Sequence, residues 1–230
     1  MKEVHLSVME ISHTDRPLET IYMAARQCYS RGSVVDMEPA RYEKMVELVQ
    51  RCMNAGHMSV LEHVSFTFAI SGVSRALSHQ LVRHRMASYS QQSQRYVKAG
   101  ELEYVCPPSL NEETSLERAF FLDSLKAAEH AYRTMLDSGV PAEDARFVLP
   151  QATATNIVMT MNCRELLHFI EERCCNKAQW EINSLAWDIR DCLVATLPDV
   201  FEDSGAKCKR LGFCPEEKSC GWFPQKGEKA

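Results

Sequence analysis

The segment Val64–Ser71 constrains the possible folds of this chain more than any other stretch. Apolar residues occupy every second position in it, which is the period of a strand with one buried face. These apolar residues are Val64, Phe66, Phe68 and Ile70. After Gly72 the apolar spacing becomes helical, through Val73, Ala76, Leu77 and Leu81. We therefore expect the chain to close a strand at Gly72 and to pass directly into a helix.

The same reasoning places the other elements of the chain. Strands are expected over residues 4–10 and 155–161, where apolar residues again alternate. Helices are expected over residues 15–29, 39–52, 115–138, 140–149, 162–173 and 179–197. Residues 88–96 lack an apolar period and are expected to form a loop or an extended segment. We predict one domain over residues 1–203 and a cysteine-bearing tail over residues 204–230, which is irregular and charged.

Residues 80–96 form a polar stretch with three arginines, several serines and glutamines, and no acidic residue. Arginine offers a planar fork of donors that binds phosphate or carboxylate in two hydrogen bonds. Gln80, Arg83 and His84 have the spacing that brings residues onto one face of a helix. The stretch therefore indicates a binding site for a phosphorylated small molecule.

Composition limits the classes of partner. The formal net charge is -5, which argues against general nucleic-acid affinity because such binding needs a broad basic surface. No apolar run approaches the roughly 20 residues that are needed to span a bilayer. The N-terminal residues lack the apolar core of a signal peptide. We therefore expect a cytoplasmic protein that binds neither nucleic acid nor a membrane.

The sequence contains 10 cysteines, which we expect to be free thiols in a reducing compartment. Three of them, Cys208, Cys214 and Cys220, recur at a six-residue spacing in the tail. A structural zinc ion takes four ligands, usually from close pairs in the sequence. Three thiols alone do not predict such a site, and we expect no bound metal.

Arg83-His84-Arg85, followed after seven residues by Ser93, resembles the RHR-x7-S signature of the flavin-dependent thymidylate synthases. Further segments fall where that family has its other motifs. They are Gly56-His57, Glu62-His63, Arg146–Pro150, Asn162-Cys163-Arg164 and Gln179-Trp180-Glu181. The resemblance extends from about residue 20 to about residue 200.

The resemblance implies both a fold and a reaction. The fold would be α+β, a single domain with a central, mostly antiparallel sheet and long helices. It would assemble as a homotetramer with active sites at the subunit interfaces. The reaction would convert dUMP to dTMP, with 5,10-methylenetetrahydrofolate as carbon donor and FAD, reduced by NADPH, as hydride carrier. No cysteine of the enzyme would act as nucleophile.

The resemblance also assigns roles to individual residues. Arg173 would be catalytic, because it matches the arginine that polarises the uracil and favours loss of the N3 proton. The matching flavin contacts are His57, Ser59, Arg83, His84, Arg85, Gln91, Asn162, Arg164 and His168. The matching dUMP contacts are Gln80, Arg83, Gln91, Gln92, Ser93, Gln94, Arg95, Arg146 and Arg173.

Two positions depart from the family pattern. Gln91 stands where many relatives have Glu, so the nucleotide site loses a carboxylate but keeps an acceptor oxygen. His168 stands where Asn is frequent, and its hydrogen bonding would depend on protonation.

Several of these residues also have purely structural interpretations. Asn162 has the position of a helix cap, and Arg146 could offset a helix dipole. Arg173 could pair with Glu171 or Glu172. Two other functions remain open from the residues alone: a nucleotide- or nucleic-acid-binding module without catalysis, and a flavoenzyme for another phosphorylated substrate.

Overall fold

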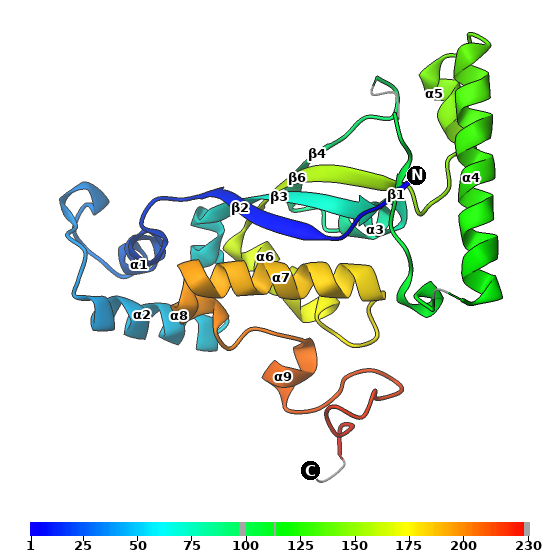
Figure 1. The fold of residues 1–230 in the computed structure, drawn as a ribbon. Helices are drawn as coiled ribbons and strands as arrows, with labels where there is room; N and C mark the ends of the chain where they lie inside the picture. Colours follow the sequence, from blue (N-terminus) through cyan, green and yellow to red (C-terminus); the bar gives the residue numbers. More distant parts are fainter. Residues whose placement is uncertain (97–99, 113, 228–230) are drawn as a thin grey trace. The chain divides into compact units, whose positions relative to one another are not determined.

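The computed structural model describes residues 1–96, 100–112 and 114–227, so the last three residues of the predicted tail lie outside it. The fold is mixed α/β, with a mostly antiparallel sheet and several helices (Figure 1). The chain divides into two compact units. Unit 1 comprises residues 1–7, 69–83 and 89–158, and unit 2 comprises residues 8–68, 84–88 and 159–230.

Within the described residues, six strands form two sheets. The strands are β1 (Lys2–Glu3), β2 (Ser7–His13), β3 (Ser65–Ser74), β4 (Ala87–Gln91), β5 (Glu103–Tyr104) and β6 (Ala154–Asn162). The larger sheet has the order β2-β3-β6-β4, and β1 pairs in parallel with β5. In unit 2, the Cys163 amide donates to the Val64 carbonyl, and the hydroxyls of Thr67 and Thr160 lie 2.9 Å apart. The residue numbers of the partners decrease along β6 as they increase along β3, so these two strands are antiparallel.

The described residues also form α-helices and short 3-10 turns. The α-helices are α1 (Pro17–Gln27), α2 (Tyr42–Asn54), α3 (Arg75–Leu81), α4 (Leu116–Asp137), α5 (Ala142–Ala145), α6 (Cys163–Arg173), α7 (Trp180–Thr196), α8 (Pro198–Phe201) and α9 (Lys207–Leu211). Short 3-10 turns cover η1 (Val34–Asp36), η2 (Met58–His63), η3 (Pro108–Leu110) and η4 (Arg146–Val148). No helix among the described residues combines the length and the apolar character needed to cross a membrane.

Unit 1 is built around a small apolar cluster and the long helix α4. Leu102, Tyr104, Cys106 and Leu125 are its buried members. The hydroxyl of Ser115 accepts from the backbone amide of Arg118 and so begins α4 as an N-cap. Helix α5 and the turn η4 pack against α4 (Figure 1). This packing fixes the position of Arg146, the first residue of η4.

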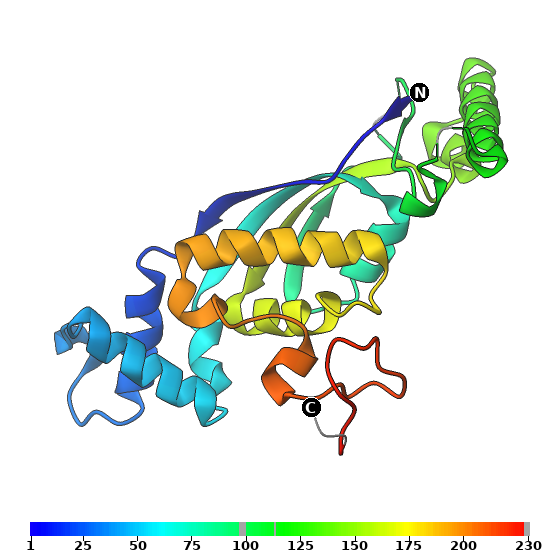
Figure 2. The same cartoon turned by 60° about the horizontal axis from the view of Figure 1, so that its bottom comes forward.

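Unit 2 buries the larger apolar core. Helices α6 and α7 lie side by side (Figure 2), and η2 packs against α6. The buried faces of the two helices are Leu166, Phe169, Ile170, Ile182, Leu185, Ala186, Ile189 and Leu193. They share the core with Phe66 and Phe68 of β3 and with Phe201 of α8. Burying large apolar side chains stabilises each by about 2 kcal/mol, so this core holds α6 firmly.

The structure confirms most of the expected elements and changes four. The expected first strand is two strands, β1 and β2. Strand β3 continues through Gly72, whose φ of 67° suits glycine and whose added Cβ would lie 2.1 Å from the His5 carbonyl oxygen. Residues 87–91 form a strand, β4, at the start of the segment expected to be loop or extended. The region after Pro198 is not fully irregular, because α8 and α9 form there.

Candidate functional site

His84 is the centre of a hydrogen-bonded group in unit 2. Only 6% of it is exposed. The Nε of Arg173 donates to His84 Nε2 at 3.0 Å, and His84 Nδ1 lies 3.3 Å from Oε1 of Glu165. Because Nε2 accepts a hydrogen bond, we assign the proton to Nδ1, which then donates to Glu165. Glu165, His84 and Arg173 thus form a chain in which each residue orients the next.

Electrostatics agree with a neutral His84. Burial, and then the nearby Arg173 and His168, together lower the pKa of His84 to about 4. Burial also raises the pKa of Glu165. The contact between Glu165 and His84 is therefore a hydrogen bond to a neutral ring, not an ion pair. At neutral pH the only cation of the three is Arg173.

The end of helix α3 explains the orientation of His84. The prediction that Gln80, Arg83 and His84 share a helix face is wrong, because α3 ends at Leu81 and a turn follows. The chain then turns His84 inward against Phe169, and leaves Arg83 and Arg85 exposed. The three residues of the signature therefore lie in different environments.

Helix α6 positions the other partners of this group. The Oδ1 of Asn162 accepts from the amide of Glu165 at 2.9 Å, so Asn162 caps the helix as its structural interpretation predicted. The carboxylate of Glu165 is turned toward His84. His168 lies one turn further, with its ring centroid 5.7 Å from that of His84. His84, Glu165 and His168 bring their ligand atoms within 4.8 Å of one another, but the His84 Nε2 lone pair already accepts from Arg173.

Arg164 and Arg173 serve different contacts, because nine residues correspond to about two and a half turns of α6 and place them on opposite sides of the helix. Arg164 donates to Glu62 of η2 at 2.5 Å. The acids next to Arg173 are engaged elsewhere: Glu171 binds Arg210, and Glu172 lies 3.7 Å from Lys207. Within residues 1–96, 100–112 and 114–227, no carboxylate lies within ion-pair distance of Arg173. Its expected structural alternative, pairing with Glu171 or Glu172, is thereby wrong.

Arg164 and His168 line a cavity of about 650 Å³ in unit 2. Apolar side chains from α2, η2, α6 and α8 form part of its wall, and basic side chains form another part. The former include Met53, Met58, Leu167 and Val200, and the latter are Arg164, Lys209 and Arg210. Glu171 and Asp203 also reach it. Two predicted flavin contacts, His57 and Ser59, lie exposed at the start of η2, beside Met58.

Unit 1 holds a second, smaller cavity of about 410 Å³. Its polar lining consists of Arg75, His79, Gln94, Arg146 and Gln151. Burial, and then the charge of Arg146, lower the pKa of Arg75. No carboxylate belongs to the described lining of this cavity. Two adjacent guanidinium groups without an acid make this cavity suitable for an anion.

Only some of the predicted nucleotide contacts reach that cavity. Gln94 and Arg146 line it. Gln91 donates to Thr155, Gln92 accepts from Asn156, and Ser93 accepts from the amide of Arg95. The guanidinium of Arg95 forms an ion pair of 2.7 Å with Glu143. Gln80 is half-buried in α3.

The sequence did not reveal Glu165, Glu62 or Arg75 as candidate site residues. Glu165 was visible only through its position three residues after a cap, which is a structural signal. Arg75 opens α3 and has no distinctive local pattern. Their partners lie tens of residues away in the chain, so no local spacing could have identified them.

Comparisons with known proteins show the family of this chain. The family described as thymidylate synthase complementing protein matches residues 11–199. A flavin-dependent thymidylate synthase of Nitratidesulfovibrio vulgaris is 48% identical, with 93% of this chain and 94% of that protein covered. One of Geobacter sulfurreducens is 46% identical, with 94% of each chain covered.

A solved structure shares the fold. It is a UMP/dUMP methylase, PolB of Streptomyces cacaoi, bound with 5-Br dUMP. The TM-score is 0.78 at 22% identity, and the match covers 88% of this chain and 96% of that one. The matches to sequence relatives extend over nearly the full length of both chains. The chain therefore belongs to the family of the flavin-dependent thymidylate synthases.

Proposed function

We propose that this protein methylates dUMP to dTMP, with 5,10-methylenetetrahydrofolate as carbon donor and FAD, reduced by NADPH, as hydride carrier. The observation that carries the proposal is the state of Arg173. A neutral, buried His84 holds its Nε, and no carboxylate of the described residues compensates its charge. A fixed cation without a counter-ion is suited to stabilise an anion that develops during a reaction.

The 650 Å³ cavity of unit 2 has the donor set that FAD needs. Its apolar wall suits an aromatic ring system, and its basic side chains suit a diphosphate. Arg164 and His168 would hold the cofactor, with His57, Ser59 and Asn162 as further contacts at the adjoining α6 and η2. When bound and reduced, FAD supplies the hydride. Glu62 keeps the Arg164 guanidinium in one orientation.

The arginine-lined cavity of unit 1 suits the phosphate of dUMP. Arg146 and Arg75 supply positive charge, and Gln94 supplies an amide. The Nε of Arg146 donates to the Glu143 carbonyl at 3.0 Å, which leaves the outer edge of its guanidinium for a ligand. We assign Gln80, Arg83, Gln91, Gln92, Ser93 and Arg95 to the remaining nucleotide contacts, in a site that neighbouring subunits complete.

Arg173 is the catalytic residue of this proposal. Its guanidinium would lie beside the uracil ring and stabilise the negative charge that forms when the base loses its N3 proton. His84 and Glu165 are positioning residues, because they act on the substrate through Arg173. A neutral His84 adds no competing positive charge, so the full effect comes from one oriented group.

The cysteines support a reaction without a thiol nucleophile. Burial is the largest cause that raises the pKa of Cys106, Cys163, Cys174 and Cys192, and it brings that of Cys174 to about 12. A thiol with a raised pKa remains protonated and is a poor nucleophile. These four thiols are therefore poorly suited to attack the substrate, in keeping with the proposal that carbon transfer involves only the substrates and the flavin.

The test is formation of dTMP by purified protein from dUMP, methylenetetrahydrofolate, FAD and NADPH. Omission of dUMP, methylenetetrahydrofolate or NADPH, or removal of the bound FAD, should stop product formation. Replacement of dUMP with UMP measures whether the 2'-hydroxyl is rejected. Arg173→Ala should lower kcat by about 100-fold or more, with flavin content unchanged.

Arg51→Ala is the matched control for Arg173→Ala. Arg51 forms an exposed ion pair with Glu47 on α2, so its loss should leave the rate unchanged. Colourless protein that binds oligonucleotides with a steep salt dependence would instead indicate a binding module. Bound flavin without dTMP formation would indicate a flavoenzyme for another substrate.

We also propose a cytoplasmic homotetramer with shared sites. Its support is exposed apolar side chains on two surfaces: Met9 and Ile11 on β2, and Leu116 and Phe120 on α4. Exposed large apolar groups on a soluble chain mark contact surfaces. Light scattering should give four times the mass of one chain.

A further inference from the structure

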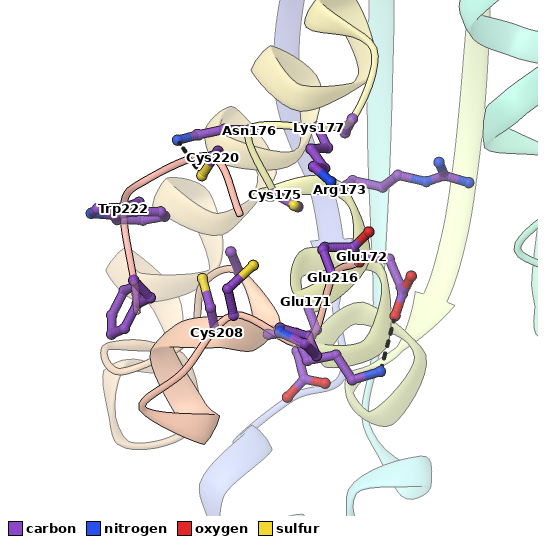
Figure 3. Close-up of a pocket in the computed structure, with 16 residues that line it drawn as sticks. Glu171, Glu172, Arg173, Cys175, Asn176, Lys177, Cys208, Glu216, Cys220 and Trp222 are labelled. Atoms are coloured by element: carbon purple, nitrogen blue, oxygen red, sulfur yellow. Dashed lines mark hydrogen bonds and ion pairs between the residues drawn. The ribbon is translucent and has the colours of Figure 1, made fainter. Parts of the chain in front are cut away.

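Four cysteines converge on one cavity of unit 2. Its volume is about 340 Å³, and Cys175, Cys208, Cys214 and Cys220 are among its lining residues. They come from separate places: the chain after α6, helix α9 and the tail beyond it. Figure 3 shows the sulfurs of Cys175, Cys208 and Cys220 facing a common space. The three thiols of the tail therefore share this cavity with a fourth thiol, that of Cys175, which lies outside the tail.

We propose that Cys175, Cys208, Cys214 and Cys220 bind one structural zinc ion. Closed sites of four thiolates are typical of structural zinc, which takes tetrahedral coordination with sulfur at about 2.3 Å. A catalytic zinc would leave one position for water, whereas this set supplies four protein ligands. From the sequence we expected no bound metal, because the tail alone offers three thiols. The present proposal replaces that expectation, because Cys175 supplies a fourth.

The surroundings of the thiols suit thiolate ligands. The Nδ2 of Asn176 lies 3.7 Å from the Cys220 sulfur and donates to it. The charged side chains of the lining balance, because Arg173, Lys177 and Lys207 are accompanied by Glu171, Glu172 and Glu216. Each ligand thiol binds the metal as the thiolate.

The tail has little else to hold it. Beyond Gly205, few of its side chains are buried, and Trp222 is 47% exposed. Its ion pairs with α6, Arg210 with Glu171 and Lys207 with Glu172, are at the surface. Such pairs contribute at most about 1 kcal/mol each. A short segment without an apolar core needs a cross-link, and a structural metal supplies one.

Zinc binding would also change the tail. Only one group of three or more His, Cys, Asp or Glu side chains among the described residues has all its ligand atoms within 4.8 Å of one another. That group is His84, Glu165 and His168, and it contains none of the four cysteines. The sulfurs are therefore spread more widely than the roughly 3.8 Å that tetrahedral Zn–S bonds of about 2.3 Å impose. Binding would draw the loop of Cys214 and Cys220 toward Cys175 and Cys208. The cysteines are all free thiols in this structure, so no disulfide competes for them.

The experiment measures metal in the full-length protein, purified without metal-affinity resin and then challenged with a chelator. We expect one zinc per chain by elemental analysis. In Cys220→Ser the content should fall by about tenfold or more. Cys28→Ser is the matched control, because Cys28 is also exposed but lies at the end of α1. It should keep its zinc.

A second readout follows the tail itself. Trypsin should cleave the zinc-bound protein slowly at the basic residues of the tail, and much faster after strong chelation or in Cys220→Ser. Circular dichroism and flavin content should stay at wild-type values, which excludes general unfolding as the cause. Zinc-free wild-type protein, or equal zinc in Cys220→Ser, would overturn the proposal. Iron in place of zinc, with visible absorption beyond that of flavin, would also overturn it in favour of an iron–sulfur cluster.

Discussion

Acidification should destabilise this protein through His84, and the effect can be calculated. The ring is neutral in the folded state, where burial, and then the nearby Arg173 and His168, lower its pKa to about 4. In the unfolded chain its pKa is about 6.5. As the pH falls below 6.5, the His84 ring binds a proton in the unfolded state but stays neutral in the folded state. The stability that the neutral His84 ring contributes is therefore present above about pH 6.5 and is lost progressively as the pH falls to about 4.

The magnitude follows from the two pKa values. At pH 5.0 the unfolded ring is almost fully protonated and the folded ring is about nine-tenths neutral, which destabilises the protein by about 2 kcal/mol relative to pH 7.5. For a chain of this length, that corresponds to a fall in Tm of about 4–8 °C. Protonation of Glu165 acts in the opposite direction, because burial raises its pKa.

The assay compares wild type with His84→Gln, which does not titrate in this range. Chemical unfolding is measured at pH 7.5 and pH 5.0, at one protein concentration and saturating flavin. The contributions of other titrating groups cancel in the difference between the two proteins. Wild type should lose about 2 kcal/mol more than His84→Gln on acidification. Equal losses of unfolding free energy in wild type and His84→Gln, found again with His84→Asn, would refute the assignment of a buried neutral ring.

Two further predictions concern α6. Asn162→Ala should lower the free energy of unfolding by about 1 kcal/mol because the helix cap is lost. Asn162→Asp keeps the acceptor oxygen and should keep the stability, but it lacks the amide donor and should bind less flavin. Unchanged flavin absorbance in Asn162→Asp would show that Asn162 serves only as a helix cap. Glu165→Gln should lower kcat by up to about 100-fold through misplacement of Arg173, with the KM for dUMP little changed, and an equal rise in KM instead would assign Glu165 to substrate binding.

The regular elements were predictable because their signals are local. Strand β3 has a strict apolar alternation, and α4 and α6 have a cap followed by a helical apolar period. These patterns reflect which face of an element the core covers, and the core of each unit covers them as expected. The ends of elements were harder, since Gly72 sits inside β3 instead of after it.

The environment of His84 was not predictable from the same signals. Polar residues carry no apolar period, so nothing in residues 80–96 marked the end of α3 at Leu81. The partners of His84 are Glu165 and Arg173, 81 and 89 residues further along the chain. Pairs so distant form only through the tertiary fold. The family signature indicated that His84 matters, and the structure shows that its side chain is buried.

Helix α6 links the proposed catalytic and metal sites. Its first residues follow the Asn162 cap, and its last residue is Arg173. Cys175, two residues later, is a proposed zinc ligand and lies where the helix has just ended. A metal bound there would fix the C-terminal end of α6, as Asn162 fixes its beginning. Because the Arg173 guanidinium points away from the thiols in Figure 3, zinc would act on catalysis only through the backbone that carries Arg173. Loss of zinc should therefore lower kcat through a less ordered Arg173, while the neutral His84 and its hydrogen bond to Glu165 remain.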